Sequence, residues 1–190
     1  MNKKEAIYQA TIDLVISEGI HNTPMSKIAK KAGISVGTIY LHFKNKEDLI
    51  GKLYMDLKKR MGEAIRKVDI KNLDTEAIFK AYWIGLYNYF SKDPKALQYM
   101  EQLRFSTYIS AKQHEEAETY YMPIINFFAE AMQMGKIKRM SIPIVASMQH
   151  AVVSNLVYQK ISGLAEVNVD ELESVCQSCW DGLKIINLKL

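Results

Sequence analysis

Residues 25–43 read MSKIAKKAGISVGTIYLHF, with a short helical pattern on each side of Gly-Ile-Ser at 33–35. A three- or four-residue turn that contains glycine is what a helix-turn-helix requires, because glycine accepts the positive φ at which the chain reverses. Ser35 is placed to cap the second helix of the pair. Apolar residues supply one seam between the two helices: Ile28, Ala29, Ile34, Ile39 and Phe43. The stretch therefore predicts a helix-turn-helix.

The outward face of the second helix suits the major groove of DNA. Its residues are Val36, Gly37, Thr38, Tyr40, Leu41 and His42. A recognition helix reads base edges with its N-terminal residues, while hydroxyl and imidazole groups contact phosphates or bases. Gly37 would let the backbone approach the duplex. Lys46, in the first turn of the next helix, is expected to bind a phosphate together with the helix amides. The alternative is that Tyr40 packs beside the helix and His42 is merely solvated.

Charge is distributed unevenly along the chain. Residues 1–60 hold eleven Lys and Arg against six Asp and Glu, whereas residues 61–190 hold fourteen against fifteen. A basic first segment fits a polyanionic partner, although many domains with other functions carry a similar charge. An adaptor bound to anionic lipid is one alternative. The lysines at 27, 30, 31, 44 and 46 cluster around the turn rather than along one amphipathic face, which favours DNA.

Helical periodicity covers the remaining sequence, and we expect about nine helices and no strand. The first helix should run from about residue 3 to 18 and end at Gly19. Thr23 is a candidate N-cap, with Pro24 at the first position of the second helix. Asn45 should cap a long fourth helix with an apolar face that includes Leu49, Leu53, Leu57 and Ile65.

Five later helix starts are expected from capping residues and periodicity. They fall at Asp74, at Asp93-Pro94, near Gln113, at Ser141 and at Asp170. The helix that begins near Gln113 should extend to about residue 134. Pro123 lies inside this pattern and should kink the helix near Tyr120.

The sequence IAKKAGISVGTIYLHFKNKEDLI at 28–50 closely resembles the signature of the TetR (tetracycline repressor) family of bacterial regulators. The matching residues are Gly33, Ser35, Gly37, Thr38, Tyr40, Phe43, Lys46 and Glu47. The resemblance is specific over about residues 5–55 and rests on length and helix count beyond them. It implies an all-α fold of nine or ten helices, a dimer, an inducer pocket in the C-terminal region, and repression relieved by a ligand.

The sequence departs from the family pattern at Pro24, where Thr or Val is more usual. The proline removes a hydroxyl that could contact phosphate and leaves Thr23 and Ser26, with Lys27 beside them, for that role. We expect residues 1–46 to form the DNA-binding domain. Residues 47–190 should form a helical domain for ligand binding and dimerisation.

Residues 82–132 are rich in aromatic and methionine side chains. Most such side chains at helical spacing fill a core, but the excess here also suits an apolar pocket with a few polar contacts. The candidates for binding a mostly apolar effector are Trp83, Tyr87, Tyr99, Phe105, Tyr108 and Tyr121. His150 is expected to be a core or interface residue.

Dimerisation is expected through the helices near 142–163 and 170–187. The first is largely apolar and carries small residues at Ala146, Ser147, Ala151 and Ser154, which let helices approach closely. Two helices from each chain would form a four-helix interface.

Other classes of function find little support in the sequence. No nucleophile motif, phosphate-binding glycine loop or cluster at metal-ligand spacing is present, so we expect neither an enzyme nor a cofactor. Cys176 and Cys179 form a single CxxC, where a zinc site normally needs four ligands. No signal peptide or membrane-spanning stretch is predicted, so a cytoplasmic location with reduced thiols is expected.

Overall fold

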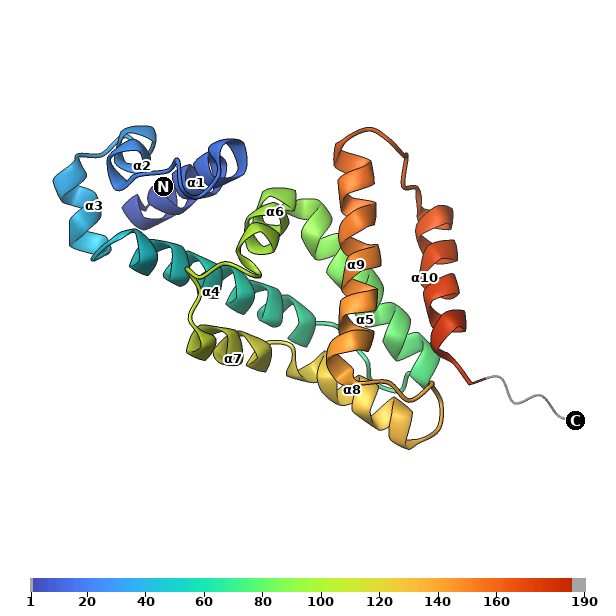
Figure 1. The fold of residues 1–190 in the computed structure, drawn as a ribbon. Coiled ribbons are helices and arrows are strands. Elements are labelled where there is room, and N and C mark those ends of the chain that lie inside the picture. The colour runs from blue at the N-terminus through green and yellow to red at the C-terminus, as the bar shows by residue number, and fades with distance from the viewer. Residues whose placement is uncertain (1, 186–190) are drawn as a thin grey trace, which may run out of the picture. The chain divides into compact units, whose positions relative to one another are not determined.

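The computed structural model describes residues 2–185, which contain ten α-helices and no β-strand. The helices are α1 (Lys3–Glu18), α2 (Met25–Lys31), α3 (Val36–His42), α4 (Lys46–Arg66), α5 (Thr75–Lys92), α6 (Pro94–Leu103), α7 (Ala111–Thr119), α8 (Met122–Gln133), α9 (Ile142–Ile161) and α10 (Val169–Leu183) (Figure 1). The all-α prediction is confirmed.

The chain divides into two compact units. One comprises Met1–Arg60 with Lys95–Glu118, and the other comprises Met61–Pro94 with Thr119–Leu190. In the first unit, α6 and α7 therefore accompany the helix-turn-helix. The Tyr99 hydroxyl of α6 donates to the carbonyl of Ile50 at 3.4 Å, and Lys95 pairs with Asp13 at 2.6 Å.

Most of the predicted helix boundaries agree with the structure. The first helix ends at Glu18, and Gly19 adopts a φ of 80°. The side chain of Asp74 caps α5 by accepting from the amide of Ala77 at 2.8 Å. The starts predicted at Pro94 and Ser141 are also observed. The last helix begins at Val169, close to the predicted Asp170, and is capped by the side chain of Asn168.

Thr23 does not cap α2, so that prediction was wrong. The N-cap is Pro24, which makes no side-chain hydrogen bond. The Thr23 hydroxyl instead donates to the carbonyl of Gly19 at 2.9 Å, and the residue is fully buried. It thereby satisfies an acceptor at the end of α1 rather than a donor at the start of α2.

The helix predicted over 113–134 is two helices, which raises the count from nine to ten. α7 ends at Thr119, and Pro123 lies in the first turn of α8. Proline has no amide hydrogen to donate, and within a continuous helix its ring would clash with the carbonyl four residues earlier, here Thr119. A first-turn position avoids both costs. The proline thus begins a helix instead of kinking one.

In the second unit, α5 packs against α8, α9 and α10 (Figure 1). Aromatic rings line these contacts. The centroids of Phe79 and Trp180 are 5.4 Å apart, and those of Tyr82 and Phe127 are 6.1 Å apart. Phe90 meets the His150 imidazole edge-on at 5.8 Å. Aromatic pairs at these separations add to the stabilisation from burial alone. α5 is therefore the helix around which this core is built.

Two glycines of α4 test how tightly the helix is packed. A Cβ on Gly62 would lie 2.7 Å from the Cβ of Tyr120 and 3.0 Å from its carbonyl oxygen. We expect Gly62→Ala to lower the free energy of unfolding by about 1–3 kcal/mol, measured by urea denaturation, because backbone cannot yield cheaply. A Cβ on Gly51 meets the flexible amide of Gln113. Gly51→Ala should change stability by less than about 1 kcal/mol, since alanine favours the helix. Equal losses of unfolding free energy in Gly62→Ala and Gly51→Ala would contradict this packing.

Candidate nucleic-acid interface

The turn between α2 and α3 has the geometry that the sequence predicts. Gly33 adopts a φ of 69°, and the amide of Ile34 donates to the carbonyl of Ala29 at 3.0 Å. Ser35 caps α3 because its side-chain oxygen accepts from the amide of Thr38 at 3.1 Å. Ile39 is fully buried and Phe43 nearly so. These contacts fix which face of α3 points to solvent.

The solvent-facing side of α3 carries the predicted set of residues. Leu41 is 84% exposed and Tyr40 52% exposed, and Val36 is also exposed. Thr38 is half-buried, and its hydroxyl lies 2.9 Å from that of Ser35. A Cβ on Gly37 would meet only the Ser35 side chain, at 3.9 Å, so the backbone there is open. Exposed aliphatic and aromatic side chains on so short a helix need a partner surface.

The start of α4 is a well-ordered helix terminus. Asn45 accepts from the amide of Asp48 at 2.8 Å, and Asp48 accepts from the amide of Lys44 at 3.0 Å. Asn45 therefore caps α4 as predicted, and the Asp48 carboxylate completes a variant of the capping box by reaching the residue before the cap. Free amides at such a terminus, with Lys46 beside them, suit a phosphate.

Lys46 is half-buried, and its ammonium lies 5.6 Å from the centroid of the Tyr108 ring. Burial lowers the pKa of Lys46, and the nearby Glu47 opposes that effect. Tyr108 also meets the His21 ring edge-on at 6.1 Å. Tyr108 is thus packed against the helix-turn-helix region of its own unit.

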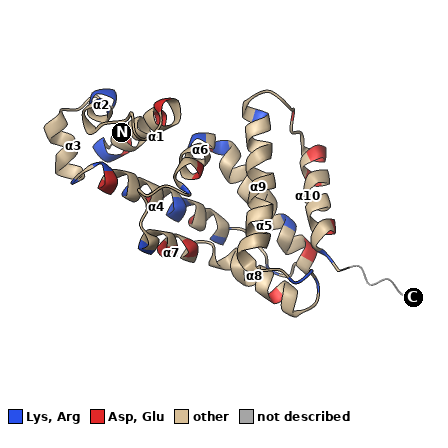
Figure 2. Ribbon diagram, viewed as in Figure 1, with Lys and Arg blue, Asp and Glu red and all other residues tan. Residues whose placement is uncertain are grey.

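The candidates around α2 differ in accessibility. Ser26 is exposed, and Lys27 is exposed and ion-paired with Glu18. Thr23 is buried and its hydroxyl is already used, as described above, so it is not available to a phosphate in this conformation. Figure 2 shows basic residues on α2 and near the start of α4.

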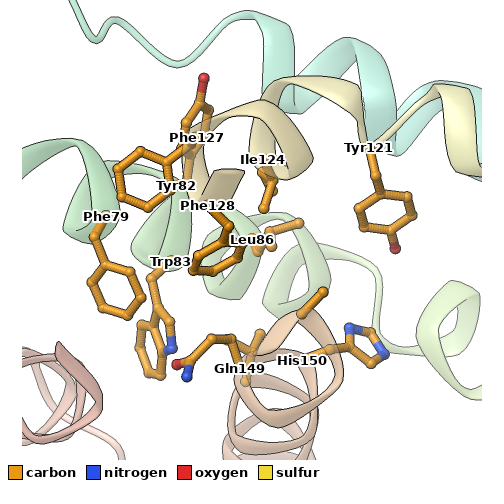
Figure 3. Close-up of a pocket in the computed structure, with 12 residues that line it drawn as sticks. Phe79, Tyr82, Trp83, Leu86, Tyr121, Ile124, Phe127, Phe128, Gln149 and His150 are labelled. Atoms are coloured by element: carbon orange, nitrogen blue, oxygen red, sulfur yellow. The ribbon is translucent and has the colours of Figure 1, made fainter. Parts of the chain in front are cut away.

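A second candidate site is a cavity of about 50 Å³ within the second unit (Figure 3). Its lining comes from α5, α8 and α9 together with Tyr121, and consists of Phe79, Tyr82, Trp83, Leu86, Tyr121, Ile124, Phe127, Phe128, Ala146, Gln149, His150 and Val153. Of the six predicted effector residues, Trp83 and Tyr121 line it. Tyr87 is buried on α5 outside the lining. Tyr99, Phe105 and Tyr108 belong to the other unit, where Phe105 is 90% exposed.

The sequence interpretation missed most of the lining residues. The signal for α5 was available, because Phe79, Trp83 and Leu86 recur at helical spacing on one face. No local pattern distinguishes Gln149 and His150 from polar residues on an exposed face. They reach the cavity because α9 packs on α5, which is a long-range contact.

The two cysteines of the CxxC differ in burial, because Cys176 is buried and Cys179 is half-buried. Burial raises the pKa of the Cys176 thiol to about 12, so it is protonated near neutral pH. Burial also raises the pKa of Cys179. Among residues 2–185 no cluster of three or more His, Cys, Asp or Glu is arranged to hold a metal ion.

Comparison with known proteins assigns the fold to a family. The family model described as "Bacterial regulatory proteins, tetR family" matches residues 7–53, and "Tetracyclin repressor-like, C-terminal domain" matches residues 53–184. This is a helix-turn-helix regulator of transcription that binds DNA. The chain belongs to the TetR family.

Individual relatives agree with this assignment. The chain is 32% identical over 137 residues to the fatty acid metabolism regulator protein of Bacillus subtilis, covering 70% of this chain and 69% of that one. It is 31% identical over 102 residues to an uncharacterised HTH-type transcriptional regulator of Haemophilus influenzae, covering 52% of each. A TetR family transcription regulator from Marinobacter aquaeolei VT8 has the same fold, with a TM-score of 0.88, 22% identity, and coverage of 96% of this chain and 95% of that one.

Within the described residues, the helices are all too short or too polar to traverse a lipid bilayer.

The cap of α3 gives a test of how the interface is positioned. Ser35→Ala removes the acceptor for the Thr38 amide, so we expect it to lower the free energy of unfolding by about 1 kcal/mol. Thr38→Ala is the matched control, because it keeps the backbone amide and the cap. Its stability should stay within about 0.5 kcal/mol of the parent in urea denaturation. A larger loss from Thr38→Ala than from Ser35→Ala would mean that the cap does not hold α3.

Proposed function

We propose that this protein is a cytoplasmic repressor without enzymatic activity, which binds a palindromic operator as a homodimer and is released by a small molecule. The observation that carries the proposal is the exposed face of α3, with Tyr40 and Leu41 directed to solvent by a buried seam and a capped N-terminus. In this proposal residues 1–46 form the DNA-binding segment, and residues 47–190 serve ligand binding and dimerisation.

The proposed DNA contacts fall into two groups. Ser26, Lys27, Ser35, Tyr40, His42 and Lys46 contact the phosphate backbone. Val36, Thr38 and Leu41 face base edges, and Gly37 lets the backbone approach. We leave Thr23 out of the set, because its hydroxyl is buried and bonded to Gly19. The Lys46 ammonium lies over the Tyr108 ring, and in this proposal it binds the same phosphate as the first amides of α4.

The proposed homodimer is supported by the size of one module and by the surface of α9. A single DNA-binding module of this kind buries roughly 600–1,000 Å² on DNA, which is small for specific binding, and a twofold pair doubles it. Along α9 the residues Ile144, Met148, Ala151 and Asn155 are exposed at spacings of three and four. On α10, Ser174, Ser178 and Gly182 form an exposed stripe of small residues. These faces suit close helix packing between two copies.

The effector is proposed to bind in the cavity of the second unit. Its lining is almost entirely hydrocarbon, which suits a mostly apolar molecule. The Bacillus subtilis relative is named as a regulator of fatty acid metabolism, which is consistent with an effector of this character. To weaken operator binding a hundredfold, the effector must prefer the non-binding state by about 2.7 kcal/mol, a normal allosteric coupling.

The phosphate contacts can be tested by replacing Tyr40 and Lys46 with alanine together. We expect weaker binding to every duplex and a salt slope reduced by about one, because the Lys46 ammonium releases a counterion on meeting a phosphate while the neutral Tyr40 hydroxyl contributes only a hydrogen bond. Thr38→Ala should instead reduce discrimination between operator and scrambled duplex, with little change in the salt slope. Fluorescence anisotropy at several salt concentrations measures both. Operator affinity and salt slope equal to the parent in the double variant would disprove the phosphate assignment.

The dimer surface can be tested with Met148→Glu on α9, a position that is 48% exposed. A carboxylate at the centre of an apolar interface is buried without a partner, so we expect a monomer in sedimentation at micromolar concentration. Gln133→Glu is the control, because it adds a charge at an exposed site on another helix, α8, and should leave a dimer. If the parent itself sediments as a monomer with and without operator DNA, the homodimer is excluded.

A further inference from the structure

Two polar atoms at the cavity of the second unit are buried without hydrogen-bond partners in the described structure. They are the indole nitrogen of Trp83 and the side-chain oxygen of Gln149. Trp83 is 2% exposed. More than nine in ten buried polar groups in native proteins are paired, so two orphans at one cavity require an explanation. Leaving a buried group unpaired costs about 1–3 kcal/mol.

The two orphan groups are chemically complementary. An indole N–H only donates, and an amide oxygen only accepts. Trp83 comes from α5 and Gln149 from α9, which pack together. Figure 3 shows the indole nitrogen on the ring edge that faces Gln149, with the amide directed toward Trp83. They do not hydrogen-bond to one another in this arrangement. A single hydroxyl of a ligand matches both, because its oxygen accepts from Trp83 and its hydrogen donates to Gln149.

Neighbouring side chains do not supply a hydrogen-bond partner for the Trp83 N–H or the Gln149 oxygen. Burial raises the pKa of the Cys179 thiol and the nearby Trp83 indole opposes that effect, but sulfur is a weak acceptor and the indole N–H forms no hydrogen bond of normal geometry. The Tyr121 hydroxyl, also at the cavity, donates to the sulfur of Met61 at 2.9 Å. Among the residues that line the cavity, the buried polar atoms without a hydrogen-bond partner are therefore those of Trp83 and Gln149.

The remaining lining selects against a charged ligand. None of the residues that line the cavity is Asp, Glu, Lys or Arg. Burial raises the pKa of Tyr82, with a contribution from Glu130, so its phenol stays neutral. A carboxylate or an ammonium in this setting would lose its hydration without gaining a fixed counter-charge, which is costly. Among the lining residues only His150 carries an imidazole, with which a carboxylate could pair.

We propose that the cavity takes a neutral, mostly apolar alcohol or phenol, whose hydroxyl bridges the Trp83 indole N–H and the Gln149 amide oxygen. The inference rests on the proposed function, in which this cavity is the effector site, and it adds the chemical class of the effector. The Trp83–Gln149 pair is a polar clamp at one end of an aromatic cavity.

Three one-ring probes at pH 7 test the clamp: phenol, its isostere toluene, and benzoate. A benzene-sized ring occupies a cavity of roughly 150 Å³, so the side chains that line the cavity of about 50 Å³ must move apart to admit any of the three. Phenol stays neutral at this pH and benzoate is ionised. The readout is the pair of tryptophan indole resonances in a ¹H–¹⁵N spectrum, assigned with Trp180→Phe. We expect phenol to move the Trp83 indole proton downfield and to bind at least fivefold more tightly than toluene, as two net hydrogen bonds predict. Benzoate should bind more weakly than phenol.

Gln149→Met replaces the amide with an apolar side chain of similar length. We expect it to abolish the preference for phenol, to leave the affinity for toluene within twofold, and to keep or raise the melting temperature, because it removes an unpaired buried acceptor. Gln133→Met is the matched control, since Gln133 is exposed on α8 and does not line the cavity. It should bind all three probes as the parent does. Trp83→Phe should also lose the preference, and it serves as a second variant.

Several outcomes would overturn the proposal. Equal affinities for phenol and toluene, unchanged by Gln149→Met, would show a cavity without a clamp. Tighter binding of benzoate would replace the hydroxyl class with an anion held by His150. No shift of the Trp83 indole with any probe would exclude the site. Operator affinity, measured alongside, separates the two proposals. If phenol binds more tightly than toluene as the clamp predicts, but does not release operator DNA, the clamp is supported and the effector role of the cavity is contradicted.

Discussion

The buried seam between α2 and α3 is the contact on which the DNA-binding surface depends. Ile28 and Ile39 are fully excluded from solvent and Phe43 nearly so. α3 is only seven residues long, too short to be stable as an isolated helix, so tertiary packing and the Ser35 cap hold it. Because Ile39 and the flanking residues Ser35 and Phe43 are committed to the seam and the cap, most of the other side chains of α3 face outward. The surface that meets DNA is thus a consequence of which side chains are buried.

A second constraint operates in the other unit, where α5 must pack against three helices at once. Its side chains Phe79, Tyr82 and Trp83 are buried, and because protein interiors are normally close-packed, a cavity beside them is a local departure. The cavity is where this packing is incomplete. Its polar atoms are sparse and come from separate helices, so a ligand that satisfies them is recognised only when α5 and α9 are in their packed arrangement. Recognition of this kind makes ligand binding sensitive to helix position.

The helix-turn-helix could be predicted in detail from sequence because its determinants are local. Gly33 supplies the positive φ, Ser35 caps α3, and Asn45 caps α4, each within a few residues of its partner. Sequence reasoning failed where the folded arrangement, rather than the local pattern, selects the partner of a side chain. Thr23 resembles an N-cap, yet its hydroxyl bonds backward to Gly19.

The cavity shows the same limit. Tyr99 was predicted to bind an effector because it is aromatic, but it is fully buried and donates to the carbonyl of Ile50, 49 residues away. Trp83 and Tyr121 were predicted and do line the cavity. Gln149 and His150 could not be assigned to it from sequence, because the packing of α9 on α5 has no signature in either helix alone. Pro123 was recognised as a break, but whether it kinks a helix or begins one depends on the carbonyl of Thr119 and on the chain that follows.

The central claim is that α3, presented twice by a symmetric dimer, reads a specific duplex. Selection of bound sequences from a random duplex library tests it most directly. The account predicts enrichment of an imperfect palindrome with half-site centres separated by about one helical turn of DNA, roughly 34–36 Å, or by a multiple of it. Recovered sequences with no enrichment over the starting library, or with a single site lacking twofold symmetry, would contradict it.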